Sequence, residues 1–207
     1  MNMEQTTASN RKNNYRGLVP TLSADHKHLG GNIKYGDPFT YCPSVLRYVV
    51  SRFAVRTALD VGSGTGYAAD FLYRQGVSVI AVDGLGENVR NAVYPTLMHD
   101  LTKSAVHCNV DLVLCQEVVE HIDEEHLDNV LSSLCCGKII VMTHALPGQR
   151  GHHHVNLQPP NYWIKHLEDR GCGLLAEDTD RIRRCAEVDG ASFMRDTALV
   201  FANYAHY

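Results

Sequence analysis

Short apolar segments alternate with amphipathic segments along most of this sequence, and the alternation limits the folds that the chain can adopt. Apolar segments with the length of buried strands lie at 57–61, 77–83, 111–116, 138–144 and 197–204. Apolar residues at helical spacing occupy the segments 43–53, 67–75, 87–94, 124–134 and 160–171. Strands that alternate with helices predict a mostly parallel sheet with helices on both faces. We therefore expect an α/β fold, a Rossmann-like three-layer α/β/α sandwich with about seven strands in its central sheet.

The chain is long enough for one domain with a full core, since 44% of its 207 residues are hydrophobic. Residues 1–30 are polar, and we predict a flexible N-terminal arm there, followed by one domain over 31–207. The segment 172–196 is charged and weakly patterned, so the sequence does not assign it. The first residues lack the apolar core of a signal peptide, and no apolar run has the length of a membrane span. These features predict a cytoplasmic protein without membrane contact.

Charge and cysteine content narrow the classes of partner. The formal net charge is -4, and no basic stripe of the kind that binds duplex nucleic acid is present. A nucleic-acid substrate is therefore disfavoured, and a small-molecule partner is expected. The seven cysteines are odd in number and include no C-x-x-C pair, which predicts reduced thiols that mostly fill the core. The oligomeric state does not follow from these features.

A glycine-rich turn follows the first predicted strand, in the stretch Asp60-Val61-Gly62-Ser63-Gly64-Thr65-Gly66. Its glycines allow a tight turn and a close approach of the backbone to a ligand. The start of the next helix offers free N–H groups to a carboxylate or phosphate, and Asp60 can pair with a cationic group. The second predicted strand ends at Asp83, where a carboxylate can accept hydrogen bonds from both hydroxyls of a ribose. The unit predicts a ribose-bearing cofactor that carries an amino group.

Other interpretations of this unit remain open. NAD also carries ribose, but its G-x-G-x-x-G fingerprint would require glycine where Tyr67 stands. Asp60 would also repel a pyrophosphate. A nucleotide-cofactor oxidoreductase is therefore the first alternative, and a cofactor-binding module that serves a partner without its own catalysis is the second. A glycine turn with a purely structural role is the third.

Four motifs resemble those of class I S-adenosylmethionine-dependent methyltransferases over residues 43–170. They are ALDVGSGTGYAADFL, VIAVDG, DLVLCQEVVEHI and GKIIVMTH. The resemblance implies S-adenosylmethionine as the cofactor and methyl transfer as the activity. It implies that Gly62 and Gly64 line the methionine end, that Asp60 faces the amino group and that Asp83 binds the ribose. The cofactor-binding set that we predict is Asp60, Gly62, Ser63, Gly64, Gly66, Asp83, Asp100 near the adenine, and Gln116.

The methyl acceptor is expected beyond the predicted strands 111–116 and 138–144. Methyl transfer depends mainly on alignment of the acceptor, and a base is needed only if the acceptor loses a proton in the step. In an extended loop, His152, His154 and Asn156 would share one side. We predict His154 as the first choice of base, with His144, His152 and Glu117 behind it. Asn156, His121 and Gln149 are the predicted substrate-binding residues.

The acceptor-side residues also have rival interpretations. Glu117, Glu120 and His121 can simply cap or pair at a helix start. His152 and His154 can bind a metal together with His144 or an acid, although we expect none, or can lie in a solvated loop. Tyr162 and Trp163 are expected mainly to pack a helix against the core.

The stretch after the predicted strand 138–144 resembles a small bacterial and phage-type subgroup of these methyltransferases. The matching residues are Pro147-Gly148-Gln149, Gly151, His154-Val155-Asn156 and Tyr162-Trp163, and YGDPFTYCPSVL is also similar. The resemblance implies that His154 and Asn156 belong to the acceptor-side wall. We therefore expect methyl transfer to O or N of a small-molecule or saccharide-like acceptor.

Overall fold

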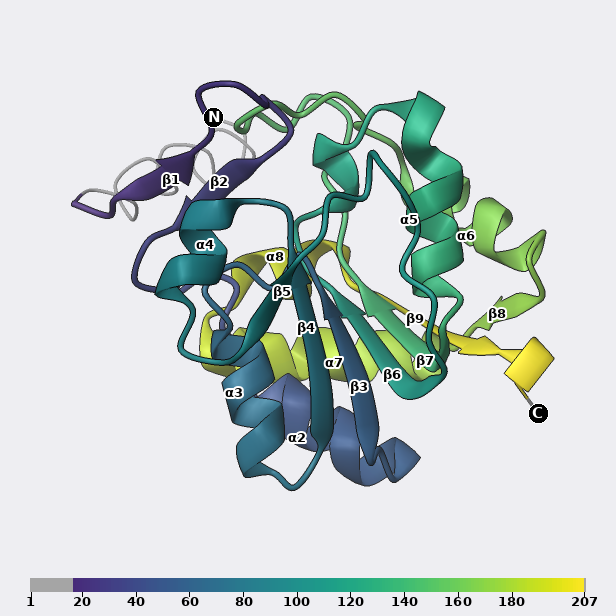
Figure 1. Cartoon of the computed structure of the whole chain (residues 1–207). Coiled ribbons are helices and arrows are strands. Elements are labelled where there is room, and N and C mark those ends of the chain that lie inside the picture. Colours follow the sequence, from purple (N-terminus) through teal and green to yellow (C-terminus); the bar gives the residue numbers. More distant parts are fainter. Residues whose placement is uncertain (1–16, 207) are drawn as a thin grey trace, which may run out of the picture.

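Seven strands form one central sheet in this computed structural model, which describes residues 17–206 of the chain. The strand order is β5-β4-β3-β6-β7-β9-β8, and only β9 runs against its two neighbours. The predicted Rossmann-like sandwich with a mostly parallel sheet is thus confirmed (Figure 1). The strands are β3 (Thr57–Val61), β4 (Ser78–Asp83), β5 (Thr96–Met98), β6 (Val110–Cys115), β7 (Gly137–Met142), β8 (Cys172–Leu174) and β9 (Leu199–Asn203).

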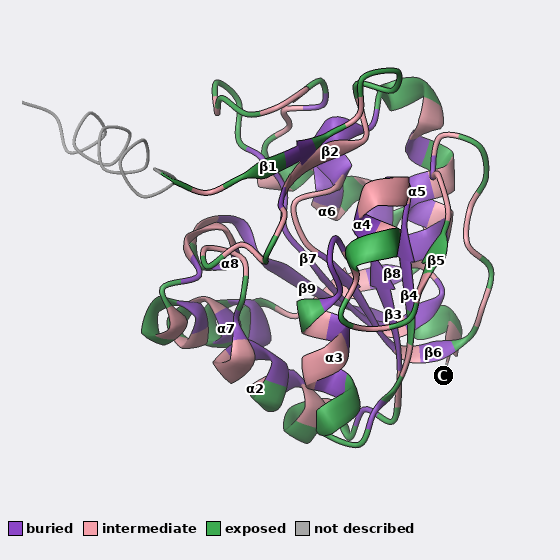
Figure 2. Cartoon of the chain, turned by 60° about the vertical axis from the view of Figure 1, so that its left-hand side comes forward, coloured by how far each residue is buried: buried purple, intermediate pink, exposed green. Residues whose placement is uncertain are grey.

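Helices cover both faces of the sheet, which explains why its strands are almost continuously apolar. One buried cluster joins the sheet to α2 (Pro43–Phe53), α3 (Tyr67–Arg74), α7 (Ala176–Asp189) and α8 (Ser192–Thr197). The other cluster joins it to α5 (Leu127–Leu134) and α6 (Pro160–Glu168), while α4 (Gly86–Asn91) lies beside β4 and β5. Figure 2 shows buried strands between helices whose outer faces are exposed. Within residues 17–206, no helix combines the length and the apolar character needed to cross a bilayer.

The register of the sheet places four strand ends in one row. Val61 of β3 pairs with Val82 of β4 on one side and with Cys115 of β6 on the other, and Cys115 pairs with Met142 of β7. The residues that follow these strands therefore meet at the carboxyl edge of the sheet. Connections leave β3 and β6 in opposite directions, which makes this edge the switch point where open α/β sheets bind ligands.

The segment 172–196, which the sequence left unassigned, contains β8, α7 and α8. The helix α7 is difficult to detect because only Asp178, Thr179, Ile182 and Ala186 of its 14 residues are buried. One of the four is charged: Asp178 accepts hydrogen bonds from the hydroxyl of Tyr48 at 2.6 Å and from Nε of Arg52 at 3.0 Å. These contacts attach α7 to α2 through polar groups that a search for an apolar stripe overlooks.

The other elements differ from expectation mainly at their ends. The helix expected over 87–94 ends at Asn91, because the N–H of Val93 turns back to the carbonyl of Thr65 at 3.0 Å. The helix expected over 124–134 begins as a 3-10 turn, Glu124–His126, before α5. The last strand starts at Leu199, since α8 occupies the preceding residues.

A β-hairpin lies over the carboxyl edge of the sheet (Figure 1). It consists of β1 (Pro20–Leu22) and β2 (Gly30–Ile33), which pair antiparallel. The hairpin begins inside the segment 1–30 for which a flexible arm was predicted, so residues 20–22 differ from that expectation by forming a strand. Residues 1–16 of the predicted arm lie outside the described residues. The remaining elements are the 3-10 turns Val119–His121 and Tyr204–His206.

Candidate active site

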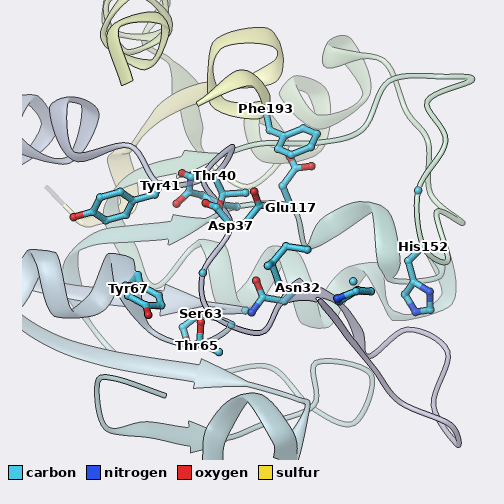
Figure 3. Close-up of a pocket in the computed structure, with 18 of the residues that line it drawn as sticks. Asn32, Asp37, Thr40, Tyr41, Ser63, Thr65, Tyr67, Glu117, His152 and Phe193 are labelled. Carbon is cyan, nitrogen blue, oxygen red and sulfur yellow. The ribbon is translucent and has the colours of Figure 1, made fainter. Parts of the chain in front are cut away.

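A cavity of about 990 Å³ opens at the carboxyl edge of the sheet. Most of its lining comes from the hairpin with the following residues 35–41, the glycine loop (residues 62–66), the residues that follow β6, and the loop after β7. Figure 3 shows Ser63 and Thr65 of the glycine loop near Asn32, with His152 at the opposite end from Tyr41 and Tyr67. The cavity therefore joins the glycine loop to the histidine loop, which we define as residues 149–156.

The glycine loop approaches its neighbours too closely for side chains. Gly62, Gly64 and Gly66 have φ values of 66°, 57° and 79°, which L residues rarely adopt. A Cβ on Gly64 would lie 2.6 Å from Nδ2 of Asn32, and one on Gly62 would overlap Val118. Gly62, Ser63 and Gly64 line the cavity, whereas Gly66 precedes α3 and packs against Tyr94. Three of the four predicted residues of the loop therefore line the cavity, and Gly66 has a packing role at the start of α3.

Asp60 lies under the glycine loop and is 3% exposed. Its Oδ2 has no hydrogen-bond partner among the described residues. Burial, with the charge of Asp83 nearby, raises the pKa of Asp60 to about 7. A buried carboxyl with an unused oxygen at the cavity wall fits a ligand that brings a cationic group.

Asp83 ends β4 and organises the opposite side of the loop. Its Oδ2 accepts the N–H of Gly64 at 2.9 Å, and its Oδ1 accepts the N–H of Leu85 at 2.8 Å and Nδ2 of Asn88 at 3.1 Å. Burial raises its pKa, while these hydrogen bonds act to lower it. A carboxylate offers about four acceptor positions, so Asp83 can still accept from a ligand hydroxyl.

The other two predicted cofactor residues lie on either side of this centre. Gln116 lines the main cavity, and its Nε2 donates to the carbonyl of Thr40 at 3.1 Å. Asp100 lines an adjoining cavity of about 70 Å³ and is paired with Nε2 of His28 at 3.1 Å. The carboxyl of Asp100 is therefore already engaged by the segment that precedes β2.

Several residues of the cavity were missed by the sequence analysis. The N-terminal part of the chain contributes Asn32, Tyr35, Asp37, Thr40 and Tyr41, and α8 contributes Phe193. The turn-like sequence YGDPFTY could have pointed to the first group, but it does not show which edge of the sheet this segment covers. Phe193 could not be found from the sequence, because the segment 172–196 was left unassigned.

The structure brings five predicted acceptor-side residues into the cavity wall: Glu117, His121, Gln149, His152 and His154. It does not bring His144 or Asn156 there. His144 is fully buried, with its ring 6.3 Å from that of Trp163, and burial lowers its pKa to about 4. Trp163 is itself 0% exposed, which confirms its predicted packing role. Asn156 is 3% exposed and belongs to the interior behind the histidine loop, which corrects its expected place in the wall.

The histidine loop is not extended, as the expected alternation required. It turns at His152-His153, and His153 has a left-handed φ of 45°. His152 and His154 nevertheless both reach the cavity wall, while His153 stays outside it. The solvated-loop interpretation therefore fails for these two imidazoles. Burial lowers the pKa of His154, and burial together with the neighbouring imidazoles lowers that of His121 to about 4.

Glu117 stands at the end of β6 with a left-handed φ of 53°. Non-glycine residues in this region are strained and often occur at functional sites. Thr143 at the end of β7 supports the conformation by hydrogen bonds to both the backbone and the carboxylate of Glu117. Glu117 is thus a rigidly held carboxylate between the two ends of the cavity, not a simple helix cap.

Comparisons with known proteins agree with this geometry. Residues 59–135 match a family model described as a methyltransferase domain. A search of curated protein sequences gives no match. Magnesium protoporphyrin IX methyltransferase from Synechocystis PCC 6803 with bound S-adenosylmethionine is 20% identical with a TM-score of 0.51, over 63% of this chain and 67% of that chain. A methyltransferase from Archaeoglobus fulgidus is 18% identical with a TM-score of 0.55, over 77% and 92%.

The residues at the glycine end fit S-adenosylmethionine. Asp60 has an unused buried oxygen for its amino group, the glycine loop leaves room for its backbone approach, and Asp83 can accept from its ribose. When bound, this cofactor supplies a methyl group on a cationic sulfur. Residues 59–135 thus match a methyltransferase domain, and the chain shares its fold with solved S-adenosylmethionine-dependent methyltransferases.

Proposed function

We propose that the chain is an S-adenosylmethionine-dependent methyltransferase, and that it transfers the methyl group to an oxygen or nitrogen atom of a small-molecule or saccharide-like acceptor. The observation that carries this proposal is the continuity of the cavity from the glycine loop to His152 and His154. The predicted cofactor-binding residues Asp60 and Asp83 belong to β3 and β4, next to the glycine loop. The end lined by the histidine loop is therefore available to an acceptor beside the cofactor.

The lining of the cavity favours a polar molecule with some apolar surface. Gln149, His152 and His154 offer hydrogen-bonding groups from the loop after β7, and Tyr35 and Phe193 add aromatic surface elsewhere in the wall. A few directed polar groups among aromatic walls are typical of sites for small organic ligands. The negative net charge of -4 is consistent with a small acceptor in preference to a nucleic acid.

An imidazole of the histidine loop can accept a proton if the acceptor must lose one. Nδ1 of His154 donates to the carbonyl of Gln149 at 3.2 Å, which leaves the lone pair on Nε2. His152 lines the same wall, and its Nε2 is buried without a partner among the described residues. We keep His154 as the first choice of base and His152 as the second.

The test combines cofactor binding with transfer. Calorimetry with S-adenosylmethionine, S-adenosylhomocysteine and NAD should show binding of the first two, and binding of NAD alone would overturn the proposal. Transfer of labelled methyl groups should then be measured on phenols, amines, sugars and sugar nucleotides, with oligonucleotides as a comparison. Transfer to oligonucleotides alone would contradict the acceptor class. Transfer that appears only after addition of a protein partner would favour the silent-module alternative.

A further inference from the structure

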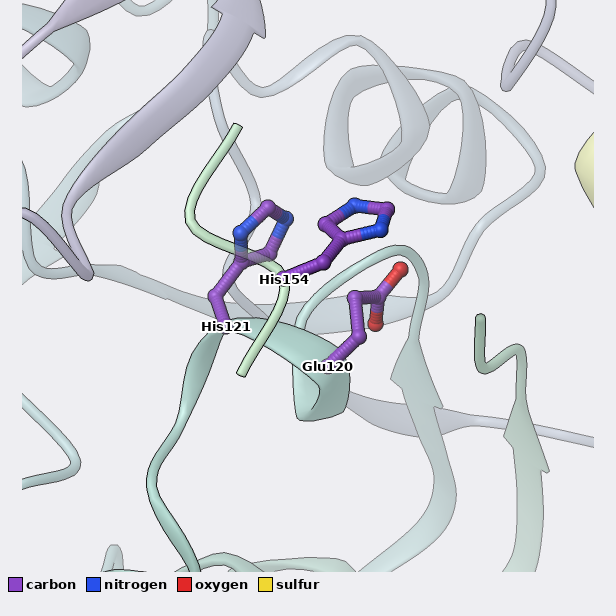
Figure 4. Close-up of side chains that lie close together, drawn as sticks. All are labelled: Glu120, His121 and His154. Atoms are coloured by element: carbon purple, nitrogen blue, oxygen red, sulfur yellow. The ribbon is translucent and has the colours of Figure 1, made fainter. Parts of the chain in front are cut away.

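Three side chains with metal-binding atoms converge at the acceptor end of the cavity. They are Glu120, His121 and His154, whose possible ligand atoms all lie within 4.8 Å of one another. Glu120 and His121 belong to the 3-10 turn after β6, and His154 comes from the histidine loop. Figure 4 shows the three side chains directed toward one another from these two segments.

The backbone holds the two segments in this arrangement. The carbonyl oxygen of Glu120 accepts the N–H groups of Val155 at 2.9 Å and Asn156 at 3.1 Å. His154 is therefore fixed next to Glu120 by main-chain contacts on its own carboxyl side. Its ring lies directly over Gly151, where any Cβ would overlap the ring atoms.

A hydrogen bond at Nδ1 sets the tautomer of His154 and leaves Nε2 able to bind a metal ion. Its Nδ1 donates to the carbonyl of Gln149 at 3.2 Å, so Nε2 carries the free lone pair. A backbone carbonyl on the second ring nitrogen is a usual partner of metal-ligating histidines, because it orients the ring and raises its basicity.

The burial of Glu120 also indicates that a cation binds here. Its side chain is 0% exposed, and neither carboxylate oxygen has a hydrogen-bond partner among the described residues. Nδ1 of His121, which is 9% exposed, also has none among them. A buried carboxylate without compensation is costly, and a bound cation is one of the few groups that can offset the cost.

We propose that Glu120, His121 and His154 bind a divalent first-row transition-metal ion, of which Zn²⁺, Mn²⁺ and Co²⁺ are the test cases. Two imidazoles and one carboxylate form a donor set that suits these ions better than Mg²⁺, which prefers oxygen ligands. Bonds of about 2.0–2.2 Å place ligand atoms about 3–3.5 Å apart.

Three protein ligands leave coordination positions open, as in catalytic metal sites. His121 and His154 line the cavity, so the open positions face the space that we assign to the acceptor. When the metal is bound, Nε2 of His154 is one of its ligands. His152 is then the imidazole that can still accept a proton from the methyl acceptor. The metal site itself does not depend on the proposed acceptor class.

The test uses the full chain, freed of metal by a chelator. Titration with Co²⁺, followed by its visible absorption, and calorimetry with Zn²⁺ and Mn²⁺ should show one ion per chain, with much weaker binding of Mg²⁺. Glu120→Gln and His154→Ala should each weaken Co²⁺ binding by more than about 10–100-fold, which is the range for loss of a partner that only orients a ligand. Gly151→Ala should weaken it as well, since it displaces the ring of His154 and removes no ligand.

His153→Ala is the matched control, because it shortens the same histidine run without touching the three ligands. It should leave Co²⁺ binding unchanged. Equal losses in His153→Ala and His154→Ala would assign the metal to the run of three histidines, 152–154, and overturn the proposal, as would the absence of Co²⁺ binding to the unmodified chain. Binding of S-adenosylmethionine by each variant reports whether the fold is intact and separates failure of the metal site from failure of the proposed function.

Discussion

The hydroxyl of Thr143 donates to Oε1 of Glu117 at 2.8 Å and accepts the backbone N–H of the same residue, also at 2.8 Å. This reciprocal pair connects the ends of β7 and β6, two strands that are neighbours in the sheet. It holds Glu117 in its left-handed conformation and directs its carboxylate to the boundary between the two ends of the cavity. The contact between the two strand ends therefore fixes both the backbone and the carboxylate of Glu117.

Thr143→Val tests this relationship, because valine keeps the shape of threonine and removes the hydroxyl. The free energy of unfolding should fall by about 1–3 kcal/mol, since a buried N–H loses its acceptor. The KM for the methyl acceptor should rise while the dissociation constant for S-adenosylmethionine stays the same. Denaturant titration and calorimetry measure the two effects. Thr96→Val, on the edge strand β5, is the control, and equal stability losses in both variants would contradict a special role for the pair.

The binding of S-adenosylmethionine should depend on pH through Asp60. Without ligand, burial and the charge of Asp83 raise the pKa of Asp60 to about 7. Below that pH the carboxyl must lose its proton before it can pair with the amino group of the cofactor. Affinity should therefore fall about tenfold per pH unit below pH 7 and level off above it. Calorimetry in buffers of different ionisation enthalpy should detect the released proton at pH 6. In Asp60→Asn this proton release should disappear, and its persistence would assign the titration to another group.

The same group should affect the stability of the ligand-free protein. An acid whose pKa is higher in the folded than in the unfolded chain destabilises the fold once it ionises. The loss begins as pH rises above 3.8, the ordinary value, and is complete above about 7. Asp60→Asn should accordingly raise the free energy of unfolding at pH 8, by a magnitude on the order of 4 kcal/mol, and leave it unchanged at pH 3.5. Urea titrations at the two pH values make the comparison.

Asp83 and Asp100 should contribute unequally to cofactor binding. Asp83→Asn removes a charged acceptor that also holds the glycine loop, so we expect affinity for S-adenosylmethionine to fall by about 10–100-fold. Asp100 is already paired with His28, and Asp100→Asn should therefore have the smaller effect. Fluorescence or calorimetric titration of both variants gives the ranking. If Asp100→Asn lowered the affinity for S-adenosylmethionine more than Asp83→Asn did, the expected contact of Asp100 near the adenine would contribute more to binding than Asp83 does.

The cofactor end could be predicted because it depends on local sequence. Strand β3 is buried from its second residue on, and β4 over its last three residues, so their apolar runs revealed them. The side chains of Asp60 and Asp83 lie where those runs end. The acceptor end depends on contacts between distant segments. Phe193 follows a charged helix, and Asn32 reaches the glycine loop from a hairpin with little apolar content. Glu120 and His154 meet only because the histidine loop turns at His153, and local periodicity does not reveal such a turn.

His154 and His144, both predicted from sequence as catalytic, should separate in kinetics. His154 lines the cavity, so His154→Ala should lower kcat by about 10²–10⁴-fold if an imidazole removes the proton, with the affinity for S-adenosylmethionine nearly unchanged. His144 is buried beside Trp163 and away from the cavity wall, so His144→Leu should change the free energy of unfolding and leave kcat/KM unaltered. Steady-state kinetics and denaturant titration on both variants provide the comparison. Loss of cofactor binding in His154→Ala would mean that the histidine loop supports the cofactor end, and loss of turnover in a stably folded His144→Leu would return His144 to the active site.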